Sequence, residues 1–322
     1  MKTINTHTGK IFVDTDRKLE FLVVGDYGKE NNIKADFLGL TKEIYGVKHF
    51  DVDLSKKFVA TISTQKGCPM KCKFCDCPSF GFHGNASLDD LIYETETILQ
   101  TMGVNTERFN LHFARMGEPT FNPNVLKFTI DHLVPLVNKY IIADTIHPVV
   151  STMLPRSNRN LLDFLLKWCD IKNNIYHGEA GLQFSINSTS DFERGYQMGY
   201  QSLGLDDISK IANTLPMPVG RKYTLNFAVT ANTTLDAKRL NALFDKDKWI
   251  VKITPIHETH AAINNDFYIG DTYTDYNVYR KFEQPLLDLG WDVIVFVPSK
   301  EEDSDRITCG NALISERDKY GV

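Results

Sequence analysis

The sequence lacks any long apolar run. None of its uninterrupted apolar stretches approaches the roughly 20 residues that a membrane-spanning helix needs. The first residues, Met1 to His7, contain no apolar core of the kind found in a secretory signal. We therefore expect a cytoplasmic protein that has no membrane partner.

The chain also lacks an excess of charge of one sign. Its 36 basic and 41 acidic residues give a net charge of −5, which argues against a broad surface for polyanions or anionic membranes. Any contact with nucleic acid must therefore be local. With 322 residues, 42% of them hydrophobic, the chain can form one large α/β domain with an appendage, or two ordinary domains.

Cysteines are few and unevenly placed. Four of the six lie between residues 68 and 77, whereas Cys169 and Cys309 are isolated. This distribution suits metal binding in a reducing compartment better than it suits a disulfide framework. The dense stretch, 68–75, has the spacing C-x3-C-x2-C, which allows one irregular loop to turn three thiolates toward a common point.

Three thiolates on one loop suit an iron–sulfur cluster. If they hold four irons, one iron lacks a protein ligand and offers an open position to a cofactor or substrate. Cys77 would complete a four-thiolate zinc site, but it lies two residues from Cys75, and zinc loops usually come as two separated pairs. We expect a catalytic cluster at Cys68, Cys72 and Cys75, with zinc as the alternative.

Strand-like runs alternate with segments of helical length through most of the chain. The expected strands are 58–62, 109–114, 147–150, 182–186, 224–229, 250–254 and 292–297. One helix should begin at Ser87, with Asp90 closing a capping box. The alternation predicts a parallel sheet or barrel with helices outside. Residues 1–55, which contain strand-like runs at 10–13 and 19–24, are expected to form a β-rich extension before a core at 56–322.

Polar motifs follow or close successive expected strands. They are the cysteine loop, the segment 115–119 with Gly117 and Glu118, then Ser151, Ser185, Asn187 and Asn232. In a parallel barrel these strand ends meet on one rim, where such barrels carry their chemistry. Each motif alone has an ordinary alternative as a turn or a helix cap. Their recurrence predicts a composite site.

These motifs resemble the radical S-adenosylmethionine (SAM) superfamily, whose cysteine motif has an aromatic residue, here Phe74, before its third cysteine. The order of motifs is similar to that of the RNA adenosine methyltransferases RlmN and Cfr over roughly residues 20–316. The matching segments are 63–68, 72–75, 81–85, 116–119, 151–152, 184–187, 230–232 and 308–310. The resemblance implies an incomplete (β/α)6 barrel of the TIM type.

The resemblance also implies the cofactors and their ligands. Cys68, Cys72 and Cys75 would hold a [4Fe–4S] cluster whose open iron SAM chelates, and an electron donor such as flavodoxin or ferredoxin would reduce it. The product would be a 5′-deoxyadenosyl radical. Gly117 and Glu118 would face the methionine end of SAM. The remaining SAM atoms would be bound by Ser151, Ser185, Asn187 and Asn232.

Cys309 is the second informative cysteine. In the family, the matching cysteine is methylated on sulfur and then adds a methylene group to the adenine ring. Here the segment 308–313 keeps the cysteine and Gly310, while Asn311 stands in place of the family's glutamine. We expect Cys309 to carry the methyl group. The alternative is an inert buried cysteine.

The sequence departs from the family pattern in three further places. Thr61 replaces the cysteine that resolves the protein–RNA adduct, and Cys77 is a candidate substitute thiol. The family's glutamate near the target ring falls at Lys34, or is displaced to Glu43. We expect residues 1–55 to be too few to hold the family's N-terminal RNA-binding domain.

We expect methylation of an adenine-type base carbon, with RNA as the favoured substrate. Two rivals remain. One is a non-methylating radical SAM enzyme that acts on a nucleotide, a modified DNA base or a peptide. The other is a non-enzymatic zinc or iron–sulfur module.

Two further groups of residues are candidates for substrate contact. The first group is basic. If the loops of these residues share the barrel mouth, they form a local rim that binds phosphate, and otherwise they are solvated surface charges. The residues are Arg156, Arg159, Arg221 and Lys222. The second group consists of one arginine and two tyrosines. These side chains either stack on a base of the substrate or belong to the hydrophobic core. The residues are Arg194, Tyr196 and Tyr200.

Overall fold

The structure, a computed structural model, describes residues 1–25, 54–267 and 270–316. Lys34 and Glu43 therefore lie outside the described residues. Ten of the described strands form one sheet in the order β1-β2-β3-β4-β7-β8-β9-β10-β11-β12, so β1 and β12 are its edges. Within the described part of the chain the barrel is therefore open rather than closed.

Seven parallel strands make up the barrel wall. They are β4 (Phe58–Ile62), β7 (Thr106–Phe113), β8 (Ala143–Thr152), β9 (Gly181–Ser185), β10 (Tyr223–Val229), β11 (Trp249–Pro255) and β12 (Val293–Val295). Each contains or overlaps one of the strands expected from the sequence. The fold prediction, an incomplete TIM-like barrel, is confirmed.

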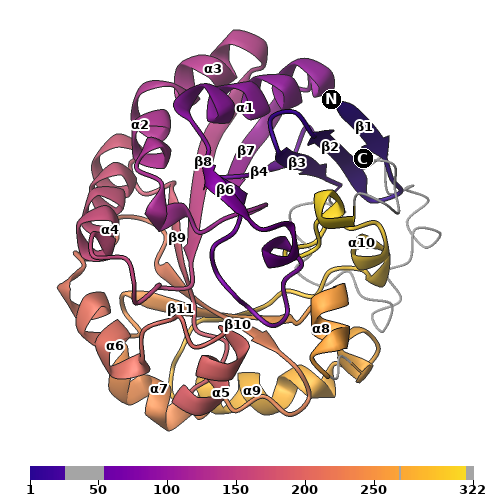
Figure 1. Cartoon of the computed structure of the whole chain (residues 1–322). Helices are drawn as coiled ribbons and strands as arrows, with labels where there is room; N and C mark the ends of the chain where they lie inside the picture. The colour runs from indigo at the N-terminus through magenta and orange to yellow at the C-terminus, as the bar shows by residue number, and fades with distance from the viewer. Residues whose placement is uncertain (26–53, 268–269, 317–322) are drawn as a thin grey trace.

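Helices connect consecutive parallel strands and lie around the outside of the barrel (Figure 1). The crossovers contain α1 (Leu88–Met102), α2 (Asn124–Asp131) with α3 (Leu133–Tyr140), α4 (Leu161–Asp170), α5 (Asp191–Gln197) with α6 (Leu205–Thr214), α7 (Ala237–Leu243), and α8 (His260–Asn264) with α9 (Asn277–Asp288). Helix α1 begins with the expected capping box: the Asp90 amide donates to Ser87 Oγ at 3.0 Å, and the Ser87 amide donates to Asp90 Oδ2 at 2.9 Å.

The two faces of the barrel strands have different environments. On β7, Phe109, Leu111 and Phe113 are fully buried in the hydrophobic core. Side chains alternate along a strand, so the residues between them face the inside of the barrel. One of these, His112, is only partly buried. We call the space inside the barrel the lumen.

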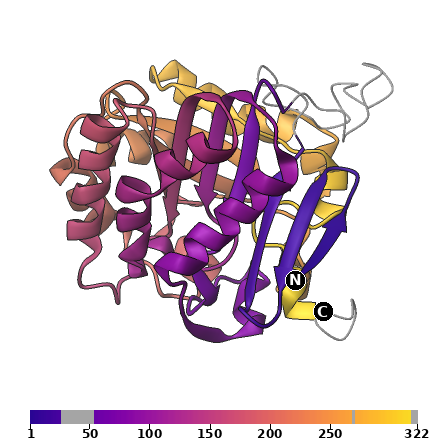
Figure 2. The same ribbon diagram turned by 90° about the horizontal axis from the view of Figure 1, so that it is seen from above.

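The N-terminal residues continue the barrel sheet. Strands β1 (Lys2–Asn5), β2 (Gly9–Asp14) and β3 (Leu19–Val24) pair antiparallel, and β3 pairs antiparallel with β4, where Leu22 lies opposite Thr61. In both views these strands stand at the edge of the barrel beside the C-terminal segment (Figures 1 and 2). The β-rich character of this region agrees with the expectation, whereas a domain boundary near residue 55 stays a prediction.

No helix in the described ranges combines the length and the apolar character needed to cross a bilayer.

A buried ion pair joins three separate parts of the chain. Glu20 on β3 and Arg115 after β7 are almost completely inaccessible to solvent, and Arg115 Nε donates to Glu20 Oε1 at 2.7 Å. The same guanidinium donates to the carbonyl oxygens of Arg306 at 2.9 Å and Thr308 at 3.3 Å. Glu20 in turn accepts from the Ile314 amide at 2.7 Å. The C-terminal segment is therefore attached to the barrel through this pair.

We predict that Glu20→Gln lowers the free energy of unfolding by about 3–5 kcal/mol, because it leaves the Arg115 charge buried without compensation. Urea titration of the full chain measures this loss. Asp163→Asn is the matched control, since Asp163 pairs with Lys167 on the exposed face of α4. It should cost about 0.5 kcal/mol or less. Equal losses in the two variants would contradict the structural role of the buried pair.

Candidate active site

The cysteine loop leaves and rejoins the barrel at one point. Its base is a two-stranded antiparallel ribbon of β5 (Gln65–Gly67) and β6 (Phe82–Asn85). Gly67 has a φ of 81°, and a Cβ on it would lie 1.8 Å from the Gly81 carbonyl oxygen. The Cys68 amide donates to that same oxygen at 3.1 Å. Only glycine fits this close approach, which closes the loop below its cysteines.

The three loop cysteines interact with one another electrostatically. Burial raises the pKa of Cys72 well above its usual range, and the charges of Cys75 and Cys68 act in the same direction. Burial also raises the pKa of Cys68 to about 12, again assisted by the charge of Cys75. A hydrogen bond from Cys77 lowers the pKa of Cys75. The three cysteines therefore lie near enough to influence one another's pKa.

Methionine side chains line the apolar side of this space. Cys72 Sγ lies 3.8 Å from Met153 Sδ and 3.9 Å from Met198 Sδ, and Met70 packs in the same group. Thioether and methyl groups exclude water without supplying a competing charged ligand. The donor set of three thiols against an apolar wall fits an iron–sulfur cluster.

The arrangement of the side chains does not by itself choose between zinc and an iron–sulfur cluster. Among residues 1–25, 54–267 and 270–316, no three or more His, Cys, Asp or Glu side chains, the loop cysteines included, converge tightly enough to hold a metal ion. The fourth thiol, Cys77, is buried and contacts the Arg115 carbonyl oxygen at 3.4 Å. Its hydrogen bond to Cys75 makes it a neighbour of that ligand rather than an exposed thiol.

The tip of the loop is tied to the opposite side of the barrel mouth. The Lys73 amide donates to the Gln197 carbonyl oxygen at the end of α5 at 2.8 Å. Thr259 Oγ1 donates to the Phe74 carbonyl oxygen, also at 2.8 Å. Phe74, the aromatic residue of the motif, packs edge-to-face on Phe267. The cysteines are thus held from both ends of the loop and at its tip.

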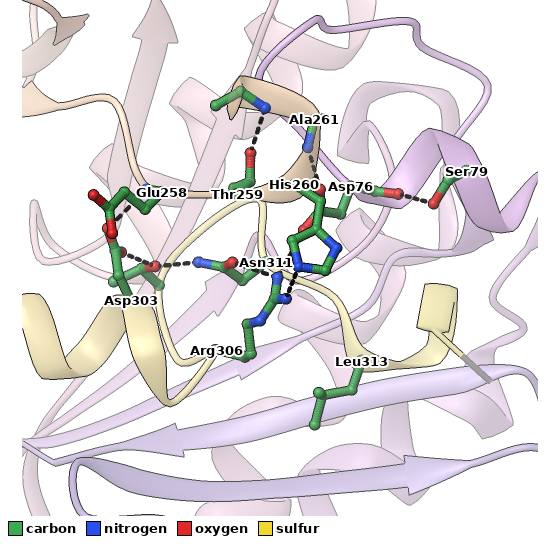
Figure 3. Close-up of polar contacts among 12 residues, drawn as sticks. Asp76, Ser79, Glu258, Thr259, His260, Ala261, Asp303, Arg306, Asn311 and Leu313 are labelled. Carbon is green, nitrogen blue, oxygen red and sulfur yellow. Dashed lines mark hydrogen bonds and ion pairs between the residues drawn. The ribbon is translucent and has the colours of Figure 1, made fainter. Parts of the chain in front are cut away.

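A second polar network links the loop to the C-terminal segment (Figure 3). Asp76 accepts from the Ala261 amide at 2.8 Å and from Arg306 Nη1 at 3.1 Å. Arg306 also donates to Asn311 Oδ1 at 3.0 Å and contacts His260 Nε2 at 2.6 Å. Burial raises the pKa of Asp76, while the Ala261 amide and the Arg306 charge oppose the rise. Asn311, the residue that stands in place of the family's glutamine, therefore takes part in the contact between the C-terminal segment and the cysteine loop.

This network brings Cys309 to the cysteine loop. The Asp76 amide donates to the carbonyl oxygen of Gly310 at 2.8 Å, and Cys309 Sγ lies 3.9 Å from the Ala114 carbonyl oxygen. Cys309 is exposed, whereas the alternative of an inert cysteine expected it to be buried. Protein atoms nevertheless crowd the thiol, and this desolvation, together with the Cys75 charge, raises the pKa of Cys309 to about 11.

Gly117 and Glu118 lie directly beside the start of the loop. Gly117 has a φ of 99°, and a Cβ there would lie 2.6 Å from the Gln65 side chain. The buried carboxylate of Glu118 accepts from Thr120 Oγ1 at 2.7 Å and from the Met153 amide at 3.0 Å. Burial raises the pKa of Glu118, and these hydrogen bonds oppose the rise. The carboxylate is therefore fixed at the mouth by the protein itself.

The other residues assigned to SAM lie at or beyond the ends of neighbouring strands. Ser151 on β8 and Ser185 on β9 are partly exposed, and within the described ranges their hydroxyls have no hydrogen-bond partner. Asn187 is buried with a φ of 62°, and its Oδ1 accepts from the Ala228 amide at 3.2 Å. Asn232, beyond β10, is exposed. Their contacts with SAM stay predictions.

Two residues at the site have roles that the sequence did not reveal. Gln65 accepts from the Glu118 amide at 2.9 Å and donates to Asn85 at 2.7 Å, so it joins the loop ribbon to the next strand end. Arg194, for which base stacking and a place in the core were alternatives, is buried and donates to the Met153 carbonyl oxygen at 3.0 Å. Its charge lowers the pKa of Cys72, opposing the effect of burial. Both depend on contacts that no local motif announces.

Comparison with known proteins shows similarity to RNA methyltransferases. No family model matches the chain. It is 35% identical to a probable dual-specificity RNA methyltransferase RlmN of Petrotoga mobilis, over 63% of this chain and 56% of that protein. It is 24% identical to the probable RlmN of Aquifex aeolicus, over 62% of this chain and 55% of that protein. The chain thus spans little more than half the length of these relatives.

The fold has a counterpart among solved structures. A radical SAM methyltransferase from Sphaerobacter thermophilus superimposes with a TM-score of 0.62 at 16% identity, covering 97% of this chain and 80% of that one. At that identity the likeness concerns the fold alone. The sequence resemblance to RlmN and the fold resemblance to a radical SAM methyltransferase point to the same superfamily, and confirm the resemblance inferred from the motifs.

Proposed function

We propose that the chain is a radical SAM enzyme that methylates an sp2 carbon of an adenine-type base, with RNA as the favoured substrate. Cys68, Cys72 and Cys75 would hold the [4Fe–4S] cluster, and Cys309 would accept the methyl group. The observation that carries the proposal is the placement of Cys309 against the three-cysteine loop, through the Asp76–Arg306 ion pair and the Gly310 carbonyl oxygen.

When bound, the cluster and SAM supply a 5′-deoxyadenosyl radical through one-electron cleavage of the sulfonium. The chain's own residues provide the enclosure and the acceptor. Met70, Met153 and Met198 exclude water from the thiols. Glu118 and the partly exposed hydroxyls of the strand ends offer acceptors for a bound amino acid moiety. Cys309, an exposed residue, offers the sulfur that would accept the methyl group.

The presence of threonine at position 61 supports a second candidate function. Thr61 lies on β4 opposite His112, alternates with the outward-facing Ala60 and Ile62, and therefore faces the lumen. A threonine hydroxyl cannot form a disulfide with a methyl-carrying cysteine, so the family's release step lacks its usual thiol. This supports, as the second candidate, a radical SAM enzyme that abstracts hydrogen without methyl transfer.

We predict that the chain, reconstituted anaerobically with iron and sulfide, converts SAM to 5′-deoxyadenosine in the presence of reduced flavodoxin or dithionite. Cys68→Ala, Cys72→Ala and Cys75→Ala should each abolish this product, because each removes a cluster ligand. Cys169→Ala on α4 is the control and should retain it, since Cys169 lies in the hydrophobic core. Chromatography of the quenched reaction measures the product. A fully loaded cluster that gives none would contradict the proposed class.

The methyl-carrier role makes a separate prediction. Intact-mass measurement of protein produced with SAM available should show one added methyl group, and Cys309→Ala should lose it while Cys169→Ala keeps it. Peptide mapping then assigns the group to residues 308–313. If wild-type protein that forms 5′-deoxyadenosine carries no methyl group, the non-methylating candidate replaces the methyltransferase.

A further inference from the structure

The lumen contains a group of basic side chains below Cys309. Inward-facing positions of the strands contribute Arg108 and His112 on β7, His147 on β8 and Lys252 on β11, and Arg221 precedes β10. Their neighbours along the strands, such as Leu111 and Ile253, pack outward in the hydrophobic core. The basic group therefore lines the barrel interior, while Arg221 is exposed, as the surface-charge alternative expected, and its Nη1 lies 2.9 Å from His147 Nε2.

The members of this group are close enough to influence one another. Burial lowers the pKa of His112 to about 3, and the charges of Lys252, Lys57, Arg221 and Arg108 act in the same direction. Burial lowers the pKa of Lys252 to about 8, with Lys57 and Arg221 contributing. Like charges held together in a partly enclosed space cost stability, so a counter-charge would be stabilising there.

The described part of the chain supplies little of that counter-charge. Glu179, which is partly exposed, lies 3.4 Å from Arg108 and 4.0 Å from His147. Lys252 forms no ion pair with any described residue, and its ammonium lies 5.0 Å from the centre of the Phe296 ring. The charge of Lys252 also opposes the rise in the pKa of the Cys309 thiol.

Buried polar atoms without partners lie on the same strands. Asn110 Nδ2, His147 Nδ1 and Asn226 Oδ1 have no hydrogen bond within the described ranges. Asn110 is paired in register with His147, and Asn226 with Lys252. Leaving such groups unsatisfied is costly, so buried polar atoms in folded proteins nearly always have a protein, water or ligand partner. These three atoms therefore point to a polar ligand in the lumen.

We propose that the lumen binds the phosphate group of the substrate, with Lys252 and Arg221 as its cationic partners and the attached base directed toward Cys309. A guanidinium matches two phosphate oxygens at once, and an ammonium adds a point charge. The inference rests on the proposed function, because it names the substrate class of that same site: a nucleotide whose base and phosphate both enter the barrel. The shared chemistry is a phosphate group, from either a free nucleotide or the end of an RNA chain.

Calorimetric titration of the reconstituted full chain tests this. Adenosine 5′-monophosphate should bind at least about tenfold more tightly than adenosine. Lys252→Met should remove most of that difference and leave adenosine binding unchanged, whereas the control Lys167→Met on the surface of α4 should preserve it. Equal affinity for nucleotide and nucleoside, together with equal affinity for the matched RNA pair described next, would overturn the proposal.

A short adenosine-ended oligoribonucleotide, with and without its 5′-phosphate, distinguishes the source. A Lys252-dependent gain only with this probe assigns the phosphate to RNA, and a gain with the mononucleotide assigns it to a free nucleotide. Arg221→Gln is a second variant should Lys252→Met fold poorly, and circular dichroism checks both. Binding without 5′-deoxyadenosine formation would refute the proposed function alone, whereas turnover with no phosphate-dependent gain for either probe would refute this inference alone.

Discussion

Burial of the Arg115 guanidinium is the constraint on which the mouth of the barrel depends. A charge taken out of water needs a carboxylate and further hydrogen-bond acceptors, and here they come from two segments distant in sequence from Arg115. Glu20 is supplied by the N-terminal strands, while the carbonyl oxygens of Arg306 and Thr308 come from the C-terminal segment. The N-terminal extension and the C-terminal segment are therefore both fixed to the strand that leads into Gly117 and Glu118.

Fixing the C-terminal segment determines what lies above the lumen. With residues 306–314 held, Arg306 pairs with Asp76 and Cys309 comes to the cysteine loop. Below Cys309, the inward faces of the strands carry the basic residues His112 and Lys252, whose pKa values are lowered by burial first and by neighbouring positive charges second. One enclosure thus combines three thiols, an accessible cysteine and a cationic floor. A substrate with a base and a phosphate suits this combination.

Local patterns in the sequence predicted the frame of this site but not its electrostatics. The alternation of strand-like and helix-like segments predicted all seven parallel strands, and Ser87 with Asp90 predicted the start of α1. Both predictions succeed because these features depend on neighbouring residues. Glu20 and Arg115 are 95 residues apart, and nothing near either residue announces the other. The same holds for Arg194 behind Cys72 and for Lys252 inside the barrel. Their roles depend on strand register and helix packing, which only the folded chain defines.

The most direct test of this account is a crystal structure of the anaerobically reconstituted protein with SAM, with iron located by anomalous scattering at its absorption edge. The account predicts a four-iron cluster bound by Cys68, Cys72 and Cys75 alone, with SAM on the fourth iron and Cys309 facing the same space. A single metal ion bound by four thiolates that include Cys77, or a Cys309 directed away from SAM, would contradict it.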